Sequence, residues 1–344
     1  MTREASTPPT LEHVARVAGV SRATVSRVIN GIRNVDPRIQ EQVQQAIAAT
    51  GYVPNRAARS LVTRRTGNIA LVVSEAEHHA FEGQFLGSVF TDPFFGRVLG
   101  GVMNHLRPLG IRLVLMAVDS AATRTQLLEG HGVDGVILVS LNSDDPAPRL
   151  LVEAKIPTVL LGRPAEPMPI NYVDVAQQTG ARLAADRLVA RGCRMVGTIS
   201  GPLDTAAGQD RMAGFRDAMT RHGHAWFPTV EGEFTRESGE RAMTRLLDEH
   251  PDLDGVFVAN DLMAFGALFA LHHAGRRVPE DVAVVGFDDS SVALTCRPPL
   301  TTIRHPLEDM AVEMTRLLLE QIEDPTLPVK SVIFEPTLVQ RESA

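Results

Sequence analysis

Beyond residue 67 the sequence alternates short apolar runs with longer amphipathic stretches, and no other feature restricts the fold as strongly. The runs are rich in Val, Ile and Leu and have the length of buried parallel strands. Seven of them stand out along the chain: Ile69–Val73, Leu113–Val118, Gly135–Val139, Thr158–Leu161, Met195–Ile199, Gly255–Ala259 and Val282–Gly286. Strands that alternate with helices predict an α/β fold with doubly wound parallel sheets.

The same region contains a short internal similarity. Asp134–Ser140 has the sequence DGVILVS, and Asp254–Asn260, 120 residues later, has the sequence DGVFVAN. One match of this kind favours two similar lobes over a single sheet that holds all the strands. In each lobe the carboxyl ends of the strands would form the ligand-binding edge.

The N-terminal region has the pattern of a helix-turn-helix. Thr10 is a natural N-cap for a first helix, Gly19 supplies a tight turn, and Ser21 caps a second helix. The second helix has Val25 on its apolar face, and its opposite face carries arginine, hydroxyl and small side chains: Arg22, Ala23, Ser26 and Arg27. Asp36-Pro37 has the signature of a third helix start.

The outer face of the second helix fits a DNA major groove. Arginine can bind guanine O6 and N7 with two parallel hydrogen bonds, and hydroxyl groups can bind phosphates. The alternative is an amphipathic surface helix with solvated arginines. The charge distribution favours DNA, since residues 1–66 hold ten Arg and four acidic residues, a balance of +6, whereas the remainder carries −13.

Residues 53–66 connect the two regions and allow two interpretations. Pro54 forces an extended approach, and Asn55 can cap a helix that is too short to be stable alone. The segment is either a simple tether or a hinge helix that folds only on DNA and inserts Leu61 between minor-groove base steps.

Several classes of function are disfavoured. Two cysteines, Cys193 and Cys296, are too few for a disulfide scaffold and fit a reducing compartment. The sequence shows no signal-peptide pattern and no bilayer-spanning run, so we expect a cytoplasmic protein without membrane contact. The pairs His78-His79 and His272-His273 lack partners at metal-ligand spacing, and no dinucleotide, phosphate-loop or nucleophile-elbow motif occurs. We therefore predict no catalytic residues, no metal and no cofactor.

From Thr10 to about Glu342 the chain resembles the LacI/GalR family of bacterial transcription regulators. The motifs that carry the resemblance follow one another in the family's order: Thr10–Ser21, Thr24–Asn30, Gly51–Asn55, Asp92–Phe95, Val159–Pro164, Arg211–Phe215, Asn260-Asp261, Gly286–Asp289 and Pro299–Ile303. The resemblance implies an all-α helix-turn-helix headpiece with a hinge helix, followed by a two-lobed α/β core like that of periplasmic binding proteins. It also implies a ligand-responsive, sequence-specific repressor, associated with the nucleoid, and not an enzyme.

The resemblance implies a homodimer on a double-stranded, pseudo-palindromic operator. Three side chains of the second helix would face base edges: Arg22, Ala23 and Arg27. Residues on the DNA backbone would be Thr10, Ser21, Thr24, Ser26, Asn30, Tyr52 and Asn55. Leu61 would be the minor-groove lever of the hinge helix, with Ala58 and Arg59 beside it.

The effector that the resemblance implies is a sugar or a related small polar metabolite. Its ligands would be Arg163, Arg211, Asn260 and Asp288, with Phe94, Phe95 and Phe234 as apolar walls. Such a set suits a sugar, since a guanidinium, an amide and a carboxylate can bind vicinal hydroxyls while rings cover the C–H faces. A solute-binding receptor that uses only the two-lobed core is the alternative function.

The expected layout is an arm over residues 1–9, a headpiece over 10–52, a hinge over 53–66 and a core over 67–344. The first lobe of the core would span about 67–172 and 301–331, and the second about 173–300 and 332–344. Two features depart from the family: Ser74–Thr91 is longer than usual, and Thr205 stands where purine-responsive members have an arginine.

Overall fold

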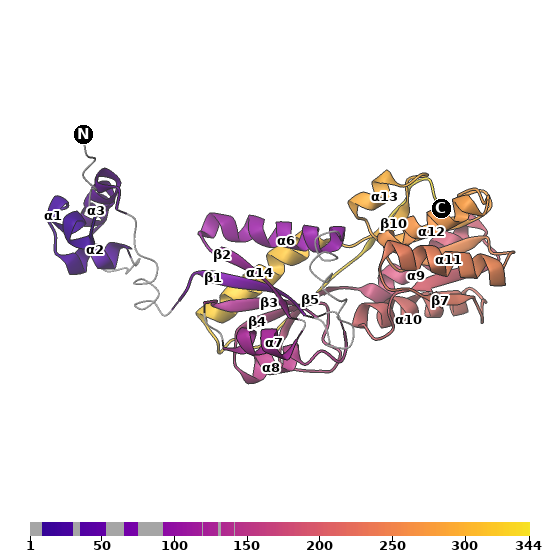
Figure 1. The fold of residues 1–344 in the computed structure, drawn as a ribbon, viewed down its shortest axis with the longest axis horizontal. Coiled ribbons are helices and arrows are strands. Elements are labelled where there is room, and N and C mark those ends of the chain that lie inside the picture. The colour runs from indigo at the N-terminus through magenta and orange to yellow at the C-terminus, as the bar shows by residue number, and fades with distance from the viewer. Residues whose placement is uncertain are drawn as a thin grey trace. The chain divides into compact units, whose positions relative to one another are not determined.

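The computed structural model describes residues 9–29, 35–52, 65–74, 92–118, 120–129, 132–140 and 142–344. The chain divides into two compact units, residues 1–67 and residues 68–344. Each unit is described below by itself (Figure 1). Within the ranges given, no helix is long and apolar enough to cross a membrane.

The first unit contains the three predicted helices, α1 (Leu11–Val17), α2 (Arg22–Ile29) and α3 (Pro37–Thr50). The Thr10 hydroxyl caps α1 by accepting the His13 amide, and the Asp36 carboxylate caps α3 by accepting the Arg38 amide. The three helices enclose a small core of Val14, Ala15, Ala18, Val25, Val43 and Ala46. The predicted helix-turn-helix headpiece is therefore confirmed.

The second unit is built on two six-stranded sheets, as the sequence predicted. The first sheet has the order β11-β5-β4-β3-β1-β2 and is parallel throughout, with β1 (Asn68–Ser74), β2 (Arg112–Val118), β3 (Gly135–Ser140), β4 (Thr158–Leu161), β5 (Asn171–Val175) and β11 (Ser331–Phe334). The second has the order β12-β10-β9-β8-β6-β7, with β6 (Val196–Ser200), β7 (Thr229–Glu231), β8 (Gly255–Val258), β9 (Ala283–Asp288), β10 (Thr301–Arg304) and β12 (Thr337–Val339). Only β12 is antiparallel to its neighbour among these strands.

Helices cover both faces of each sheet (Figure 1). In the first lobe, α6 (Pro93–Leu106) and α14 (Leu307–Glu323) pack with alternate strand residues such as Ile69 and Leu71. The opposite face, with Ala70 and Val72, packs against α7 (Ala121–Leu128) and α8 (Ala147–Glu153). This alternation of side chains explains why the strands read as continuous apolar runs.

The second lobe repeats this arrangement. Helices α9 (Gln177–Arg191) and α10 (Ala206–Arg221) cover one face, and α11 (Arg236–Glu249) and α12 (Asp261–His273) cover the other. The short helix α13 (Ser291–Thr295) also packs on the second of these clusters.

The chain crosses between the lobes three times, and each crossover lies a few residues beyond the expected boundary. β10 belongs to the second sheet, although residues 301–304 were expected in the first lobe, and most of β11 was expected in the second lobe but lies in the first sheet. The physical reason is that each strand continues to its last ladder partner, Arg304 opposite Asp288 and Phe334 opposite Val175, before the chain leaves the sheet.

Glycines bring α11 and α12 into close contact. A Cβ at Gly266 would lie 2.0 Å from the Arg236 carbonyl oxygen, and one at Gly239 would lie 2.1 Å from the Met263 carbonyl oxygen. The two backbones therefore approach more closely than any side chain would allow.

Gly266→Ala should lower the free energy of unfolding by roughly 1–3 kcal/mol, because its Cβ would meet a backbone oxygen that cannot move freely. Gly100→Ala on α6 is the matched control, since nothing lies within 4 Å of its Cβ. The control should gain up to about 1 kcal/mol from helix propensity. Urea unfolding followed by circular dichroism measures both variants, and equal stabilities would contradict the close packing of α11 and α12.

Candidate functional site

The outer face of α2 presents the predicted base-reading residues to solvent. Arg22, Ala23 and Arg27 are exposed, whereas Val25 is fully buried. The Ser21 hydroxyl accepts the Thr24 amide at 3.1 Å and caps the helix. The headpiece core therefore fixes this helix with its arginines outward.

Arg22 has a local partner, because its Nε lies 3.1 Å from the Glu12 carboxylate. Both side chains are more than half exposed, and an exposed ion pair of this kind contributes little stability. A base or a phosphate can therefore replace Glu12 at small cost.

The other predicted DNA contacts divide into two groups. Thr10 stands at the N-terminus of α1, Ser26 and Thr24 are half-buried on α2, and Tyr52 packs on the headpiece core. The remaining predicted contacts lie outside the described residues: Asn30, Asn55, Ala58, Arg59 and Leu61.

In the core, three predicted effector residues lie at the carboxyl ends of strands of the second sheet. Asp288 ends β9, Asn260 follows β8, and Phe234 follows β7. The Asn260 amide donates to the Phe234 carbonyl oxygen at 3.1 Å. The same amide's oxygen accepts the Met263 amide at 2.9 Å and caps α12, which leaves one N–H and one lone pair of the Asn260 side chain for a ligand.

Arg211 comes from α10 and inserts its guanidinium into this edge of the sheet. The side chain is 4% exposed and stacks on the Phe287 ring at 3.7 Å. Its Nε donates to Gln177 at 2.8 Å, one Nη donates to the Ala259 carbonyl oxygen, and the same Nη lies 3.5 Å from Asp288 Oδ1. Burial lowers the pKa of Arg211, while the charge of Asp288 opposes that shift.

Two consecutive residues with left-handed backbone set the direction of the Asp288 carboxylate. Asp288 has φ 105° and Asp289 has φ 51°, a costly conformation that clusters at functional sites. The Asp289 carboxylate accepts Arg304 at 2.8 Å and is also paired with Arg341. This leaves Asp288 beside Arg211.

Residues of the first lobe face the same edge. Asp92 caps α6 by accepting the Phe94 amide at 2.9 Å, and the Phe94 ring lies 5.9 Å from the ring of His305. Burial, together with the charge of Asp288, raises the pKa of Asp92 to about 6. Phe94, Arg211, Asn260, Asp288 and Phe234 are thus the predicted residues that the structure brings together.

Two predicted effector residues have other partners. Phe95 packs in the apolar cluster of the first lobe, where it lines a small recess with Val73 and Val139. Arg163 Nε forms an ion pair with Asp210 of the second lobe at 2.6 Å. Phe95 therefore supports the first lobe, and Arg163 links the lobes through Asp210. Their role as effector contacts stays a prediction.

Sequence reasoning missed His305 and Gln177. His305 follows β10 at a crossover and is 2% exposed, with its Nδ1 3.5 Å from Asp288 Oδ1. Gln177 follows the first crossover and carries the hydrogen bond to Arg211. The available signal was their position close to a strand end, whereas Asn260 and Asp288 were identified through the family resemblance.

Polar contacts also join the lobes near this edge. The Arg97 guanidinium of α6 donates to the carbonyl oxygens of Asp288 at 2.8 Å and His305 at 2.9 Å, and it pairs with Glu308 at 2.7 Å. On another side, the amide of Ser143 donates to the Asp204 carbonyl oxygen at 2.8 Å. Contacts of this kind can be exchanged when lobes rotate.

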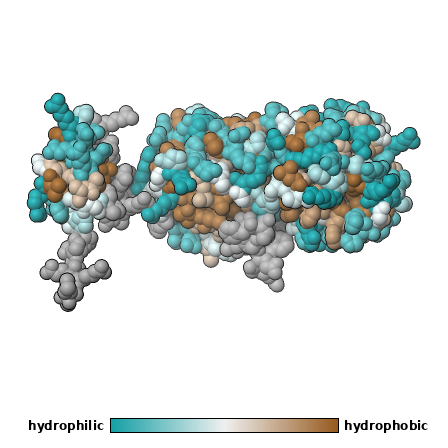
Figure 2. All heavy atoms as spheres, turned by 90° about the horizontal axis from the view of Figure 1, so that it is seen from above, coloured by the Kyte–Doolittle hydropathy of each residue, from teal (hydrophilic) through white to brown (hydrophobic). Residues whose placement is uncertain are grey.

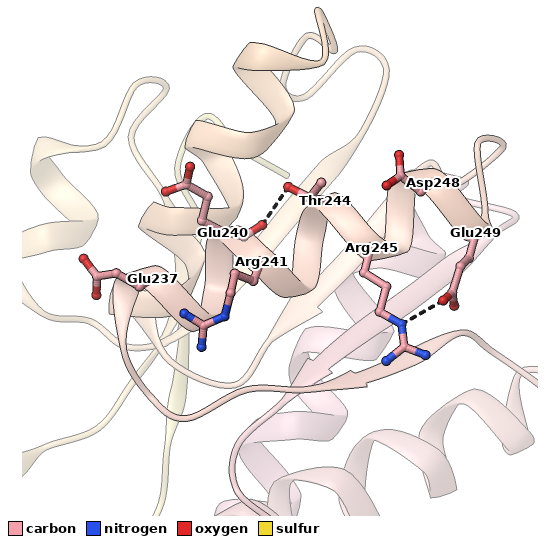
Figure 3. A pocket seen from close by; sticks show the side chains of 7 residues that line it. All are labelled: Glu237, Glu240, Arg241, Thr244, Arg245, Asp248 and Glu249. Carbon is pink, nitrogen blue, oxygen red and sulfur yellow. Dashed lines mark hydrogen bonds and ion pairs between the residues drawn. The ribbon is translucent and has the colours of Figure 1, made fainter. Parts of the chain in front are cut away.

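A separate hollow lies along α11 (Figure 3). All of the residues that line it come from that one helix: Glu237, Glu240, Arg241, Thr244, Arg245, Asp248 and Glu249. In Figure 3 the Arg245 side chain reaches along the helix to Glu249, with a distance of 2.7 Å. It is a solvated charged face and includes none of the residues at the sheet edge. In the part of the chain that the structure describes, no group of three or more acidic, His or Cys side chains could hold a metal ion.

Comparisons with known proteins agree with this architecture. Residues 10–55 match the model "Bacterial regulatory proteins, lacI family", and residues 185–344 match "Periplasmic binding protein-like domain". The chain is 46% identical over 342 residues to the HTH-type transcriptional regulator CelR of Thermobifida fusca, which covers 97% of this chain and 98% of that protein.

Two solved structures extend the similarity to three dimensions. A transcriptional regulator CelR–cellobiose complex matches with a TM-score of 0.75 at 43% identity, over 98% of this chain and 100% of that one. The lac repressor dimer bound to operator and the anti-inducer ONPF matches with a TM-score of 0.80 at 28% identity, over 98% and 99% of the two chains.

A receptor that uses only the two-lobed core is excluded by the match of residues 10–55. Headpiece and core both have their counterparts in these regulators, and the chain therefore belongs to the LacI family of bacterial regulatory proteins, as a ligand-responsive DNA-binding transcriptional regulator and not an enzyme.

Proposed function

We propose that this regulator is a repressor whose effector is a sugar bound at the carboxyl edge of the second sheet. The observation that carries the proposal is the meeting of Arg211, Asn260 and Asp288 with the rings of Phe94 and Phe234. Polar groups of both signs beside aromatic rings suit the vicinal hydroxyls and apolar C–H faces of a sugar.

Cellobiose is the first sugar to test. The 43% identical CelR structure is a complex with cellobiose, and a disaccharide offers hydroxyls to both lobes. A purine is disfavoured, because Thr205 accepts the Gly208 amide at 3.0 Å as the cap of α10 and offers no cationic group.

The protein acts as a homodimer on a pseudo-palindromic operator. It works in the cytoplasm and is associated with the nucleoid through its DNA partner. Hydrophobic surface, brown in Figure 2, reaches the exterior of the core in several places among hydrophilic residues. Exposed apolar side chains occur in both lobes: Met103, Val114, Val312, Phe265, Phe269 and Leu294. These side chains are available to a subunit interface, and the related lac repressor structure, which is a dimer on operator, supports the homodimer.

In this mechanism the arginines of α2 read base edges, and the sugar changes the relative position of the two lobes. The change reaches residues 53–66, which include the proposed hinge helix with Ala58, Arg59 and Leu61. Effector and operator affinities are then linked by one coupling free energy. The test is a sequence-selection assay on random DNA, followed by operator binding with cellobiose, glucose, ribose and lactose. A protein that selects a site but responds to none of these sugars would overturn the effector assignment.

Arg27→Ala should weaken binding to the selected operator by roughly 1–3 kcal/mol and relax the preference at one base pair, because a bidentate contact is lost. Arg22→Ala should relax a different base pair. Arg38→Ala, which removes an equal charge from the exposed start of α3, should leave the sequence preference intact. Wild-type discrimination by both α2 variants in the same assay would show that another surface reads the bases.

Asp288→Asn should lower the affinity for the responding sugar by about 2–4 kcal/mol, because a dry, charge-assisted hydrogen bond is lost. Operator affinity without sugar should stay unchanged, since the headpiece is intact. Isothermal titration calorimetry and an operator-binding curve measure the two quantities. Asp186→Asn is the control, because its carboxylate lies on the surface of the second lobe, where it pairs with His222. Equal sugar affinity in both variants would contradict the proposed site.

A further inference from the structure

The crossover after β10 brings buried polar atoms together. Among the described residues, three buried polar atoms at this place have no hydrogen-bond partner: Asp288 Oδ1, His305 Nδ1 and His305 Nε2. A buried polar group without a partner costs free energy, so native structures rarely keep one without a use. Here three such atoms meet on two side chains.

The distances between these atoms fit a bridging hydroxyl group. His305 Nδ1 lies 3.5 Å from Asp288 Oδ1, and Arg211 Nη1 lies 3.5 Å from the same oxygen. Both separations are too long for good direct hydrogen bonds. One hydroxyl oxygen placed about 2.8 Å from both His305 and Asp288 would satisfy the two groups at once.

The imidazole has the protonation state that this contact needs. Burial lowers the pKa of His305, although the nearby charge of Asp288 works in the opposite direction. The ring is therefore neutral at pH 7, with one nitrogen as donor and the other as acceptor. Asp288 accepts only, and thus a hydroxyl can donate to Asp288 while it accepts from His305.

The surroundings hold the ring in place without using its nitrogens. The rings of Phe94 and Phe287 flank His305, with centroids at 5.9 Å and 6.2 Å. Its carbonyl oxygen accepts Arg97 Nη2 at 2.9 Å, so the backbone is fixed as well. A rigid side chain with unpaired polar atoms is preorganised for a ligand.

We propose that His305 is a specificity-determining effector contact, which binds one sugar hydroxyl jointly with Asp288 and offers its second ring nitrogen to a neighbouring hydroxyl. The proposal rests on the sugar site described above and adds to it a residue of the crossover between the lobes. A sugar with a vicinal diol at this point is favoured over an analogue that lacks either hydroxyl, because the analogue would leave buried polar atoms unpaired.

The test compares His305→Leu and His305→Gln with His222→Leu, whose ring is on the surface and pairs with Asp186. Thermal unfolding is measured without sugar, and calorimetry is performed with cellobiose or with whichever of glucose, ribose and lactose binds the wild-type protein. His305→Leu should unfold at the same or a higher temperature, since unpaired polar atoms are replaced by an apolar side chain of similar size. Its sugar affinity should fall by about tenfold or more. His305→Gln, which keeps a donor and an acceptor, should lose less, and His222→Leu should lose none.

Failure of this inference and failure of the sugar assignment are distinguishable. A wild-type protein that binds none of the sugars overturns the sugar assignment, and His305 falls with it as a sugar contact. If the wild-type protein binds a sugar and His305→Leu binds it with equal affinity, only the role of His305 is overturned. A clear drop in the unfolding temperature of His305→Leu would identify the ring as a structural partner of Asp288 and would also overturn the proposal.

Discussion

The effector side of the core depends on the burial of one cation, the Arg211 guanidinium. A charge that is 4% exposed persists only if it is paired, hydrogen-bonded or stacked. Arg211 has all three kinds of partner: Asp288, Gln177 with the Ala259 carbonyl, and the Phe287 ring. Because these partners come from β9, the first residue of α9 and the end of β8, the cation joins separate elements into one polar edge. The positive charge of Arg211 also compensates the buried Asp288 carboxylate. This carboxylate can then accept a hydrogen bond from a ligand hydroxyl.

The strained turn at Asp288 and Asp289 is held by residues from distant parts of the chain. Arg341 near the C-terminus and Arg304 of β10 bind the Asp289 carboxylate, and Arg97 of the first lobe binds the Asp288 carbonyl. A conformation that costs free energy persists where its surroundings over-determine it. The position of the Asp288 carboxylate therefore depends on both lobes, and a ligand that moves Asp288 also changes the contact with α6. The hydrogen bond from Arg97 to the Asp288 carbonyl oxygen is thus one contact through which an effector can change the orientation of the lobes.

Local patterns in the sequence predicted most of the fold, and tertiary contacts account for what was missed. The seven apolar runs are strands, and Thr10, Gly19 and Ser21 mark the helix-turn-helix, because caps and periodicity act within a few residues. Asn260 and Asp288 were predicted through the family resemblance, and both lie at strand ends. Asp210, the partner of Arg163, is 47 positions away along the chain, and the lobe to which β10 belongs depends on its ladder with β9. Neither contact is visible in the local sequence pattern. His305 was missed because its position after a strand end does not reveal that Asp288 and Phe94 lie beside it.

The crossovers connect the proposed effector site to both lobes of the core. Gln177 directly follows the first crossover and His305 lies in the second. The Ala176 amide donates to the Phe334 carbonyl oxygen at 2.8 Å, which joins the first crossover to the third. A ligand bound between Asp288 and His305 therefore contacts the segments about which the lobes can rotate. Since a ligand shifts an equilibrium only by its difference in affinity for the two states, contacts that join the two lobes shift the lobe orientation more than contacts within one lobe. Residues that end strands at a crossover can thus both recognise the effector and transmit its binding.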